Sequence, residues 1–250
     1  TGTETNSCQL LEGSNVTFKN GTLKSDNNKI MIQNYCNLTL DNMTVEDTNA
    51  QYVVSNNCGN ISINNTTINA GSNANQFAFD VCGYAKYTAG VTVTVSGTSV
   101  INGKVEISKS AGNTELMKLN ITSGTFNGDL KVDASVGTEN AQSIISVSGG
   151  TFSDPSVLKY MATNATVDIK LLSNINIAKT ELATGYILNA ANATANLNLN
   201  GHDIINSSET ADATPFTQIF TVQNGTLNIS GNGNVKCDAS ATAKDDGYRM

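Results

Sequence analysis

The feature that most constrains the fold of this chain is a short internal repeat. The segment LNITSGTFN, residues 119–127, has two alternating apolar residues, Leu119 and Ile121, then a small polar turn and a third apolar residue, Phe126. The same arrangement recurs along the chain, and two looser copies carry one extra residue in the turn. The first apolar residues of the copies are Val16, Leu38, Ile61, Val93, Leu119, Ile145, Val167, Leu197 and Leu227.

The spacing of the copies, 22 to 32 residues, is typical of solenoid repeats. Their apolar residues alternate with period two, β-branched residues dominate, and the turns contain Asn-Gly or Gly-Gly, so the repeats indicate strands and not helices. Most copies have a second short strand ahead of the repeat, such as residues 77–81. We therefore predict an all-β fold, a single-stranded, parallel, right-handed β-helix of about nine coils that forms one elongated domain over residues 1–250.

Stacking of the coils should place like residues above one another. We expect columns of Val, Ile, Leu and Phe inside, with Phe126 over Phe152 as one aromatic stack. The abundant asparagines should stack in turns and hydrogen-bond along the solenoid. The Asn-x-Ser/Thr triplets are accordingly interpreted as part of these turns and not as glycosylation sites.

Residues 153–165, SDPSVLKYMATNA, interrupt the strand pattern. Ser153 or Asp154 could cap a helix with Pro155 at its first position. We expect a short helical insertion near residues 154–162, lying outside the coil.

Three consecutive connections between the second strand and the repeat are longer than the others: residues 82–92, 108–118 and 133–143. Binding sites in solenoids often develop on insertions of one face. Tyr84 and Tyr87, in the first of them, are the candidate ligand-binding residues, because sugars stack on exposed aromatic rings and the chain has no Trp. The alternative is that a tyrosine packs over the coil edge and bonds the backbone.

The five cysteines are Cys8, Cys36, Cys58, Cys82 and Cys237, with no metal-type spacing. Cys36, Cys58 and Cys82 each follow a short strand, so we expect them to form an internal column of free thiols. A disulfide between neighbouring coils is the alternative. Free thiols favour synthesis in a reducing cytoplasm over secretion.

Charge and motifs argue against several function classes. A net charge of −7 argues against nucleic acid as a partner, and no apolar run is long enough to span a membrane. We expect no catalytic residues, no metal site and no cofactor, since the acidic residues do not gather in one element and His202 fits a structural turn. The acidic and basic residues considered are Asp129, Asp133, Asp154, Asp168, the pair Asp245 and Asp246, and Arg249, the one arginine.

Three segments carry a family resemblance: GGTFSDPSVLKYMA (149–162), VDIKLLSNINI (167–177) and LNLNGHDI (197–204). They resemble repeat segments of large β-helical surface proteins of bacteria and of phage virion proteins. The resemblance implies a pectin-lyase-like fold and an exposed setting, and it implies no activity. The five cysteines depart from the secreted members and favour the virion members.

These observations predict a non-enzymatic structural or adhesive module, first of a phage virion as a head or tail fibre or decoration protein. A repeat domain of a bacterial cell-surface adhesin is the alternative, and a polysaccharide-degrading β-helix enzyme is the second one. The expected partners are other protein subunits, in a homotrimer for a fibre, and a glycan or host-surface receptor. The expected location is extracellular or on the virion, with the bacterial cell surface as the alternative. We also expect the chain to be an excerpt of a longer one.

Overall fold

The chain folds into parallel β-sheets. The computed structural model describes residues 6–177, 185–206 and 219–237. It is all-β, with 58% strand and 5% helix, and its parallel sheets form a β-solenoid of about seven turns, so the predicted fold class is confirmed with fewer coils than the expected nine. The chain divides into two compact units, Thr1–Phe152 and Ser153–Met250, which are described separately below.

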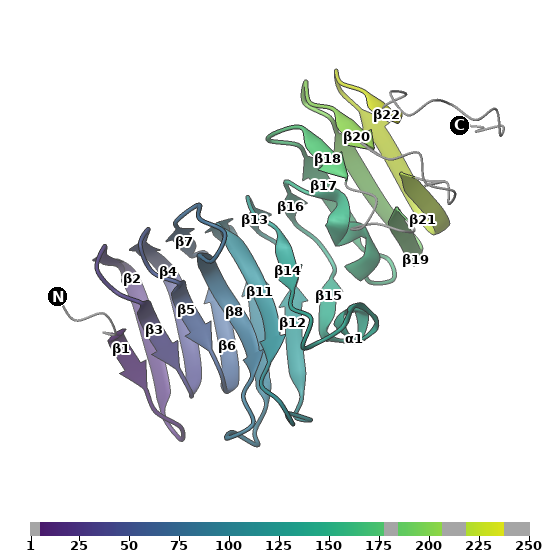
Figure 1. Cartoon of the computed structure of the whole chain (residues 1–250). Coiled ribbons are helices and arrows are strands. Elements are labelled where there is room, and N and C mark those ends of the chain that lie inside the picture. The colour runs from purple at the N-terminus through teal and green to yellow at the C-terminus, as the bar shows by residue number, and fades with distance from the viewer. Residues whose placement is uncertain (1–5, 178–184, 207–218, 238–250) are drawn as a thin grey trace. The chain divides into compact units, whose positions relative to one another are not determined.

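The first unit contains a six-stranded parallel sheet, which we call sheet A (Figure 1). One strand comes from each successive coil, and each pairs with the equivalent strand of the next coil. In spatial order the strands are β1 (Asn6–Leu10), β3 (Ile30–Asn34), β5 (Tyr52–Asn56), β8 (Phe77–Gly83), β11 (Lys104–Lys109) and β14 (Leu130–Val132).

The remaining strands of the first unit form a second parallel sheet, sheet B, which packs against sheet A. Two long strands, β2 (Asn15–Ser25) and β4 (Asn37–Asp47), each span the full width of a coil. In the following coils a turn divides this strand into two shorter ones. They are β6 (Gly59–Asn64), β7 (Thr67–Ala70), β9 (Val91–Ser96), β10 (Val100–Asn102), β12 (Met117–Ile121), β13 (Thr125–Phe126), β15 (Ile145–Val147) and β16 (Thr151–Phe152).

The strand register confirms the repeat found in the sequence. The first apolar residues of six copies pair in one continuous column, Val16, Leu38, Ile61, Val93, Leu119 and Ile145. The third apolar residue of the copy at Val93 needs one correction. The spacing of seven residues, as between Leu119 and Phe126, predicts Val100, whereas Ile101 is the residue that pairs with Ile68 and with Phe126. Ile101 is completely buried. The turn before it is one residue longer than the pattern assumed.

The interior consists of the expected apolar columns. Leu38, Ile63 and Leu119 are among its completely or almost completely buried side chains. The predicted aromatic stack is present, since the rings of Phe126 and Phe152 are nearly parallel with centroids 5.1 Å apart. Burial of these columns between coils is the main source of stability in such a fold.

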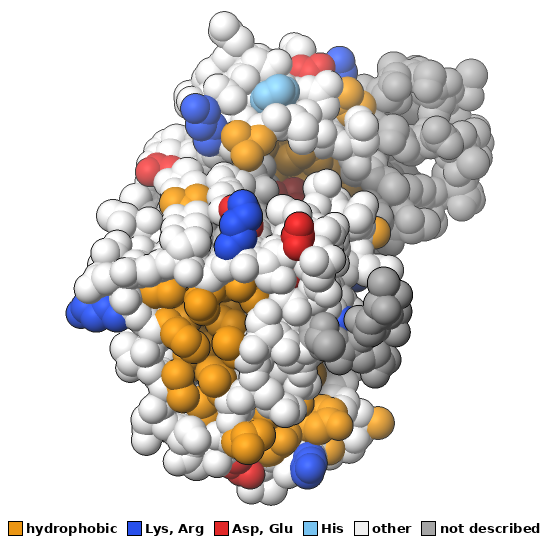
Figure 2. All heavy atoms as spheres, turned by 90° about the vertical axis from the view of Figure 1, so that its left-hand side faces the viewer, with side chains coloured by type: hydrophobic (Ala, Val, Ile, Leu, Met, Phe, Trp, Pro, Cys, Tyr) orange, Lys and Arg blue, Asp and Glu red, His pale blue; other side chains and the backbone are white. Residues whose placement is uncertain are grey.

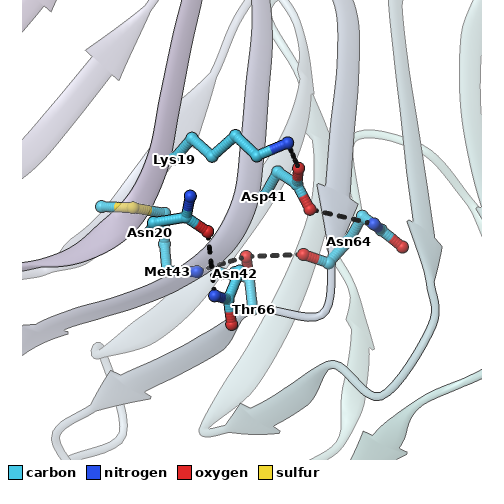
Figure 3. A network of polar contacts seen from close by, with 7 residues as sticks. All are labelled: Lys19, Asn20, Asp41, Asn42, Met43, Asn64 and Thr66. Atoms are coloured by element: carbon cyan, nitrogen blue, oxygen red, sulfur yellow. Dashed lines mark hydrogen bonds and ion pairs between the residues drawn. The ribbon is translucent and has the colours of Figure 1, made fainter.

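Asparagines form the predicted ladder in the turns (Figure 3). Asn20, Asn42 and Asn65 occupy equivalent turn positions and all have positive φ, between 48° and 57°. This left-handed conformation is accessible to Asn because its short side chain bonds locally. Asn42 Nδ2 donates to Asn20 Oδ1 in the preceding coil at 2.9 Å. Beside this ladder, Asp41 binds Lys19 at 2.8 Å and accepts a hydrogen bond from Asn64.

The first coil leaves part of the core uncovered. Cys8, Leu10, Val16, Phe18 and Leu23 are only partly buried, whereas their counterparts in the next coils are buried. Figure 2, which looks onto this end, shows hydrophobic side chains gathered in a patch there. Leu11 beside it is 62% exposed.

The cysteine prediction holds in part. Cys36 and Cys58 are buried and free. Burial raises the pKa of the Cys36 thiol, and the neighbouring Cys58 raises it further. Cys82 does not occupy the equivalent position, because it lies within β8 and pairs with Ser108, whereas Cys36 and Cys58 follow the ends of their strands. Burial raises the pKa of Cys82 to about 12. Cys8 pairs with Ile32. The side chain of Cys237 lies outside the described residues.

The second unit has two smaller parallel stacks. The first consists of β17 (Thr166–Lys170), β19 (Tyr186–Asn198) and β21 (Phe220–Ser230). The second consists of β18 (Ile175–Ile177), β20 (Ile204–Asn206) and β22 (Val235–Cys237).

The register of the second unit corrects one copy of the repeat. Leu197 pairs with Ile169 and Ile229, and Ala195 occupies the position that equates with Val167 and Leu227. The sequence alignment was therefore wrong by two residues in this coil. A slip of two keeps every side chain on the same face of a strand, so apolar alternation alone does not detect it.

The helical insertion expected near residues 154–162 is a 3-10 helix, η1 (Pro155–Tyr160). Asp154 caps it by accepting a hydrogen bond from Ser156 N at 2.7 Å, and Pro155 is at its first position, as predicted. Its position outside the coil is only partly as expected. Val157, Leu158 and Tyr160 are buried and η1 packs against β19, so it contributes to the core of its unit.

Candidate ligand-binding surface on the stacked insertions

The three long insertions lie on the same side of the first unit and stack in the order of their coils. Ser110 in the second insertion bonds Gly83 and Ala85 in the first, through its backbone N–H and its hydroxyl. Val91 N donates to Leu116 O at 2.8 Å. Lys118 Nζ donates to Ser143 O in the third insertion at 2.6 Å. The insertions therefore form one continuous surface.

The first insertion brings the two predicted tyrosines together. The ring centroids of Tyr84 and Tyr87 are 5.8 Å apart, and Tyr87 N donates to Tyr84 O at 2.9 Å, which closes a turn. Tyr84 is 42% exposed and Tyr87 is half-buried. Lys86 Nζ lies 5.9 Å from the centroid of the Tyr87 ring, within the range of a cation–π contact.

A third tyrosine, which the sequence analysis did not identify, completes the cluster. Tyr35 follows β3 two coils earlier, and its ring centroid is 4.6 Å from that of Tyr87. Burial raises the pKa of Tyr35, and Tyr87 adds to this effect. We call Tyr35, Tyr84 and Tyr87 the tyrosine cluster. Its partly exposed rings offer aromatic faces of the kind that bind the apolar face of a sugar.

The third insertion contains an α-helix that the sequence analysis did not predict, α1 (Thr138–Ile144). Gly137 precedes it with φ of 78°, a conformation that favours glycine. Ala141 is completely buried, and Asn140 Nδ2 donates to Val136 O at 2.8 Å. These contacts hold α1 against the coil next to β12 and β15 (Figure 1).

A second polar cluster lies on the face of sheet A that points away from the core. Asp80 and Glu106 are register partners on adjacent strands, and Glu106 is the partner of Lys131. They alternate with core residues along their strands, which places them on the opposite face. Tyr52 Oη donates to Glu106 Oε2 at 2.5 Å, and Lys131 Nζ lies 3.9 Å from Glu106 Oε1.

Burial controls the protonation of this cluster. Asp80 is 3% exposed and accepts hydrogen bonds from Ser55 Oγ and Asn56 N. Burial raises its pKa to about 8 against the opposing effect of these two bonds. Burial and the bond to Glu106 also raise the pKa of Tyr52. Because Asp80 and Glu106 are both covered, the pair is suited to holding the sheet together more than to reaching a substrate.

The other acidic residues considered in the sequence analysis that the structure describes, and His202, take part in hydrogen bonds of turns and neighbouring strands. His202 lies in a turn and its backbone N–H donates to Leu199 O at 2.8 Å. Asp133 accepts from Ser135 N, and Asp168 accepts from Asn196. The backbone carbonyl of Asp129 accepts a hydrogen bond from Val105 N. Asp245, Asp246 and Arg249 lie outside the described residues.

Within the described ranges, no three His, Cys, Asp or Glu side chains are placed to hold a metal ion. No helix in the part of the chain that the structure covers is long and apolar enough to cross a bilayer.

The fold and the surface define the class of this protein as a parallel β-solenoid with insertions stacked on one side. Comparison with family models, curated proteins and solved structures finds no match for the chain.

Proposed function

We propose that this chain is a non-enzymatic structural and adhesive module of an exposed assembly, and that its stacked insertions contact the target. The observation that supports the proposal is the tyrosine cluster. Its residues follow hydrogen-bonded parallel strands, which form a rigid support for the rings. A rigid support lowers the conformational entropy lost when a ligand binds. The target class we infer is a glycan, because Tyr84 and Tyr87 provide partly exposed aromatic faces.

The assembly that we favour is a phage virion, in which the chain serves as a head or tail fibre or decoration protein. Buried free thiols at Cys36 and Cys58 support synthesis in a reducing cytoplasm. The segments near residues 149–204 that resemble virion and surface proteins support an exposed setting. A repeat domain of a bacterial cell-surface adhesin is the alternative assembly, and the same binding surface would serve it.

Binding of the wild-type chain to a glycan array, followed by calorimetry on any glycan that binds, tests the proposal. Tyr84→Ala and Tyr87→Ala should each weaken binding at least tenfold, since truncating a central aromatic contact costs about 1–2 kcal/mol or more.

Leu172→Ala is the matched control, because Leu172 is an exposed apolar residue of the second unit and not of the insertions. This variant should bind as the wild type does. Glycan binding that both tyrosine variants retain in full would refute the assignment of the surface.

A polysaccharide-degrading enzyme is the second candidate, and it would have to use the covered pair Asp80 and Glu106 on adjacent strands. Two carboxyl groups of this kind are what glycoside hydrolysis requires. Incubation with a panel of polysaccharides should release no new reducing or unsaturated ends if the module is adhesive. Release that disappears in Glu106→Gln would establish the enzyme instead.

A further inference from the structure

The first unit has a groove between its second insertion and α1. Its volume is about 370 Å³, near the lower end of the range for small-molecule sites. Met117 and Val136 are buried in its floor, and Leu116 and Ile144 add partly exposed apolar surface. The groove is separate from the tyrosine cluster, none of whose residues lines it.

Asn113 lines the groove and has an unfulfilled hydrogen-bond donor. Its side chain is 7% exposed, and its Oδ1 accepts from Glu115 N at 3.2 Å. Its Nδ2 is buried and has no acceptor among the residues that the structure describes. Burying an amide N–H without an acceptor is unfavourable, so this position favours an added oxygen atom close to Asn113.

Two cations lie at the same groove. Lys118 Nζ donates one hydrogen bond to Ser143 O at 2.6 Å, and an ammonium group has three N–H donors in all. Lys109 also lines the groove, and Glu115 is the one carboxylate among the described lining residues. The cations therefore outnumber the acids here, although the whole chain carries a net charge of −7.

The geometry points to a binding site for a small organic carboxylate about the size of one six-membered ring. The carboxylate accepts hydrogen bonds from Asn113 Nδ2 and the Lys118 ammonium, and the ring lies on the apolar floor. Charge-assisted hydrogen bonds of this kind are the stronger ones in proteins. Either a sugar acid or a less polar ring acid could supply this chemistry.

Ligand-observed NMR on the intact chain tests the site with defined probes. D-glucuronate and cyclohexanecarboxylate represent the two sources, and D-glucose and cyclohexanemethanol are their neutral counterparts. At least one carboxylate should bind with a Kd of about 1 mM and much more tightly than its neutral counterpart. The carboxylate that binds more tightly identifies the source.

Two substitutions assign the binding to the groove. Lys118→Gln should weaken it about tenfold, and Asn113→Asp should abolish it, because a second carboxylate would face the ligand. Lys86→Gln is the matched control, because Lys86 lies over Tyr87 in the first insertion, and it should change nothing. Circular dichroism confirms that each variant is folded, and Lys118→Gln still tests the site if Asn113→Asp is not.

Failure of both carboxylates to bind at about 20 mM, equal binding of the neutral compounds, or full binding by Lys118→Gln would each overturn the inference. None of these outcomes bears on the glycan proposal, which depends on the tyrosine cluster.

Discussion

Asn42 combines two roles in its turn, and a pair of substitutions separates them. Its φ of 54° suits Asn or Gly, and its side chain donates to Asn20 in the preceding coil. Asn42→Gly removes the hydrogen bond alone, whereas Asn42→Ala also introduces strain from a Cβ in the left-handed region. We expect Ala to lower the free energy of unfolding by about 1 kcal/mol more than Gly, measured by urea denaturation. Equal losses would mean that backbone strain contributes nothing at this turn.

Asp80 should make stability depend on pH. Its pKa of about 8 in the folded chain lies above the ordinary value of 3.8, so the unfolded chain loses the proton first. The contribution of Asp80 to the free energy of unfolding is complete below about pH 4 and is lost as the pH rises towards 8. Asp80→Asn mimics the protonated form and should remove this loss. Between pH 4 and pH 9 the stability of the variant relative to the wild type should therefore rise by on the order of 5 kcal/mol.

The control for this measurement is Asp133→Asn. The hydrogen bonds from Ser135 lower the pKa of Asp133, so its contribution has the opposite sign and is lost as the pH falls. Parallel curves of unfolding free energy against pH for Asp80→Asn and the wild type would show that Asp80 is ionised in the folded chain.

At the scale of elements, the cap of η1 gives a direct test. Asp154 Oδ1 accepts a hydrogen bond from Ser156 N, and the helix that follows buries Val157 and Leu158. Asp154→Ala should lower the free energy of unfolding by about 1 kcal/mol, whereas Asp154→Asn, an equally good cap, should change it by a few tenths. Thermal or urea unfolding measures both. A loss as large in Asn as in Ala would show that the charge, and not the hydrogen bond, stabilises this end.

How far the sequence predicts these elements depends on the length of the pattern. The column from Val16 to Ile145 was predicted correctly because both alternation and turn spacing recur there. The coil at Leu197 was misplaced, since alternation is unchanged by a slip of two. The helix α1 was missed because its seven residues are too few for a helical period to be recognised.

The candidate site was only partly predictable for a different reason. Tyr84 and Tyr87 share one insertion, so their proximity follows from the local sequence. Tyr35 and Tyr87 are far apart in the sequence and meet only through the fold of the insertion. Asp80 and Glu106 could have been found by aligning FDV (79–81) with VEI (105–107), in which the acidic residues occupy corresponding positions.

For the whole molecule, the proposed fibre implies a homotrimer. Association of three chains would bury apolar surface. The first coil offers such surface, since Leu10 and Phe18 are only partly buried and hydrophobic side chains form a patch at this end (Figure 2). Light scattering on the full-length protein should therefore give the mass of three chains. A monomer would contradict the fibre and favour the tethered adhesin.

The in-register pairing of β2 with β4 also has a consequence for how the gene can change. Val16 and Leu38 are partners 22 residues apart, so a chain without residues 16–37 would place Leu38 where Val16 was, with the strands that follow still in step. An in-frame loss or duplication of one complete coil thus leaves every remaining neighbour matched, whereas a change of one residue within a strand turns its apolar side chains outward. Molecules of this kind can therefore vary in length between relatives by whole coils while keeping the same cross-section.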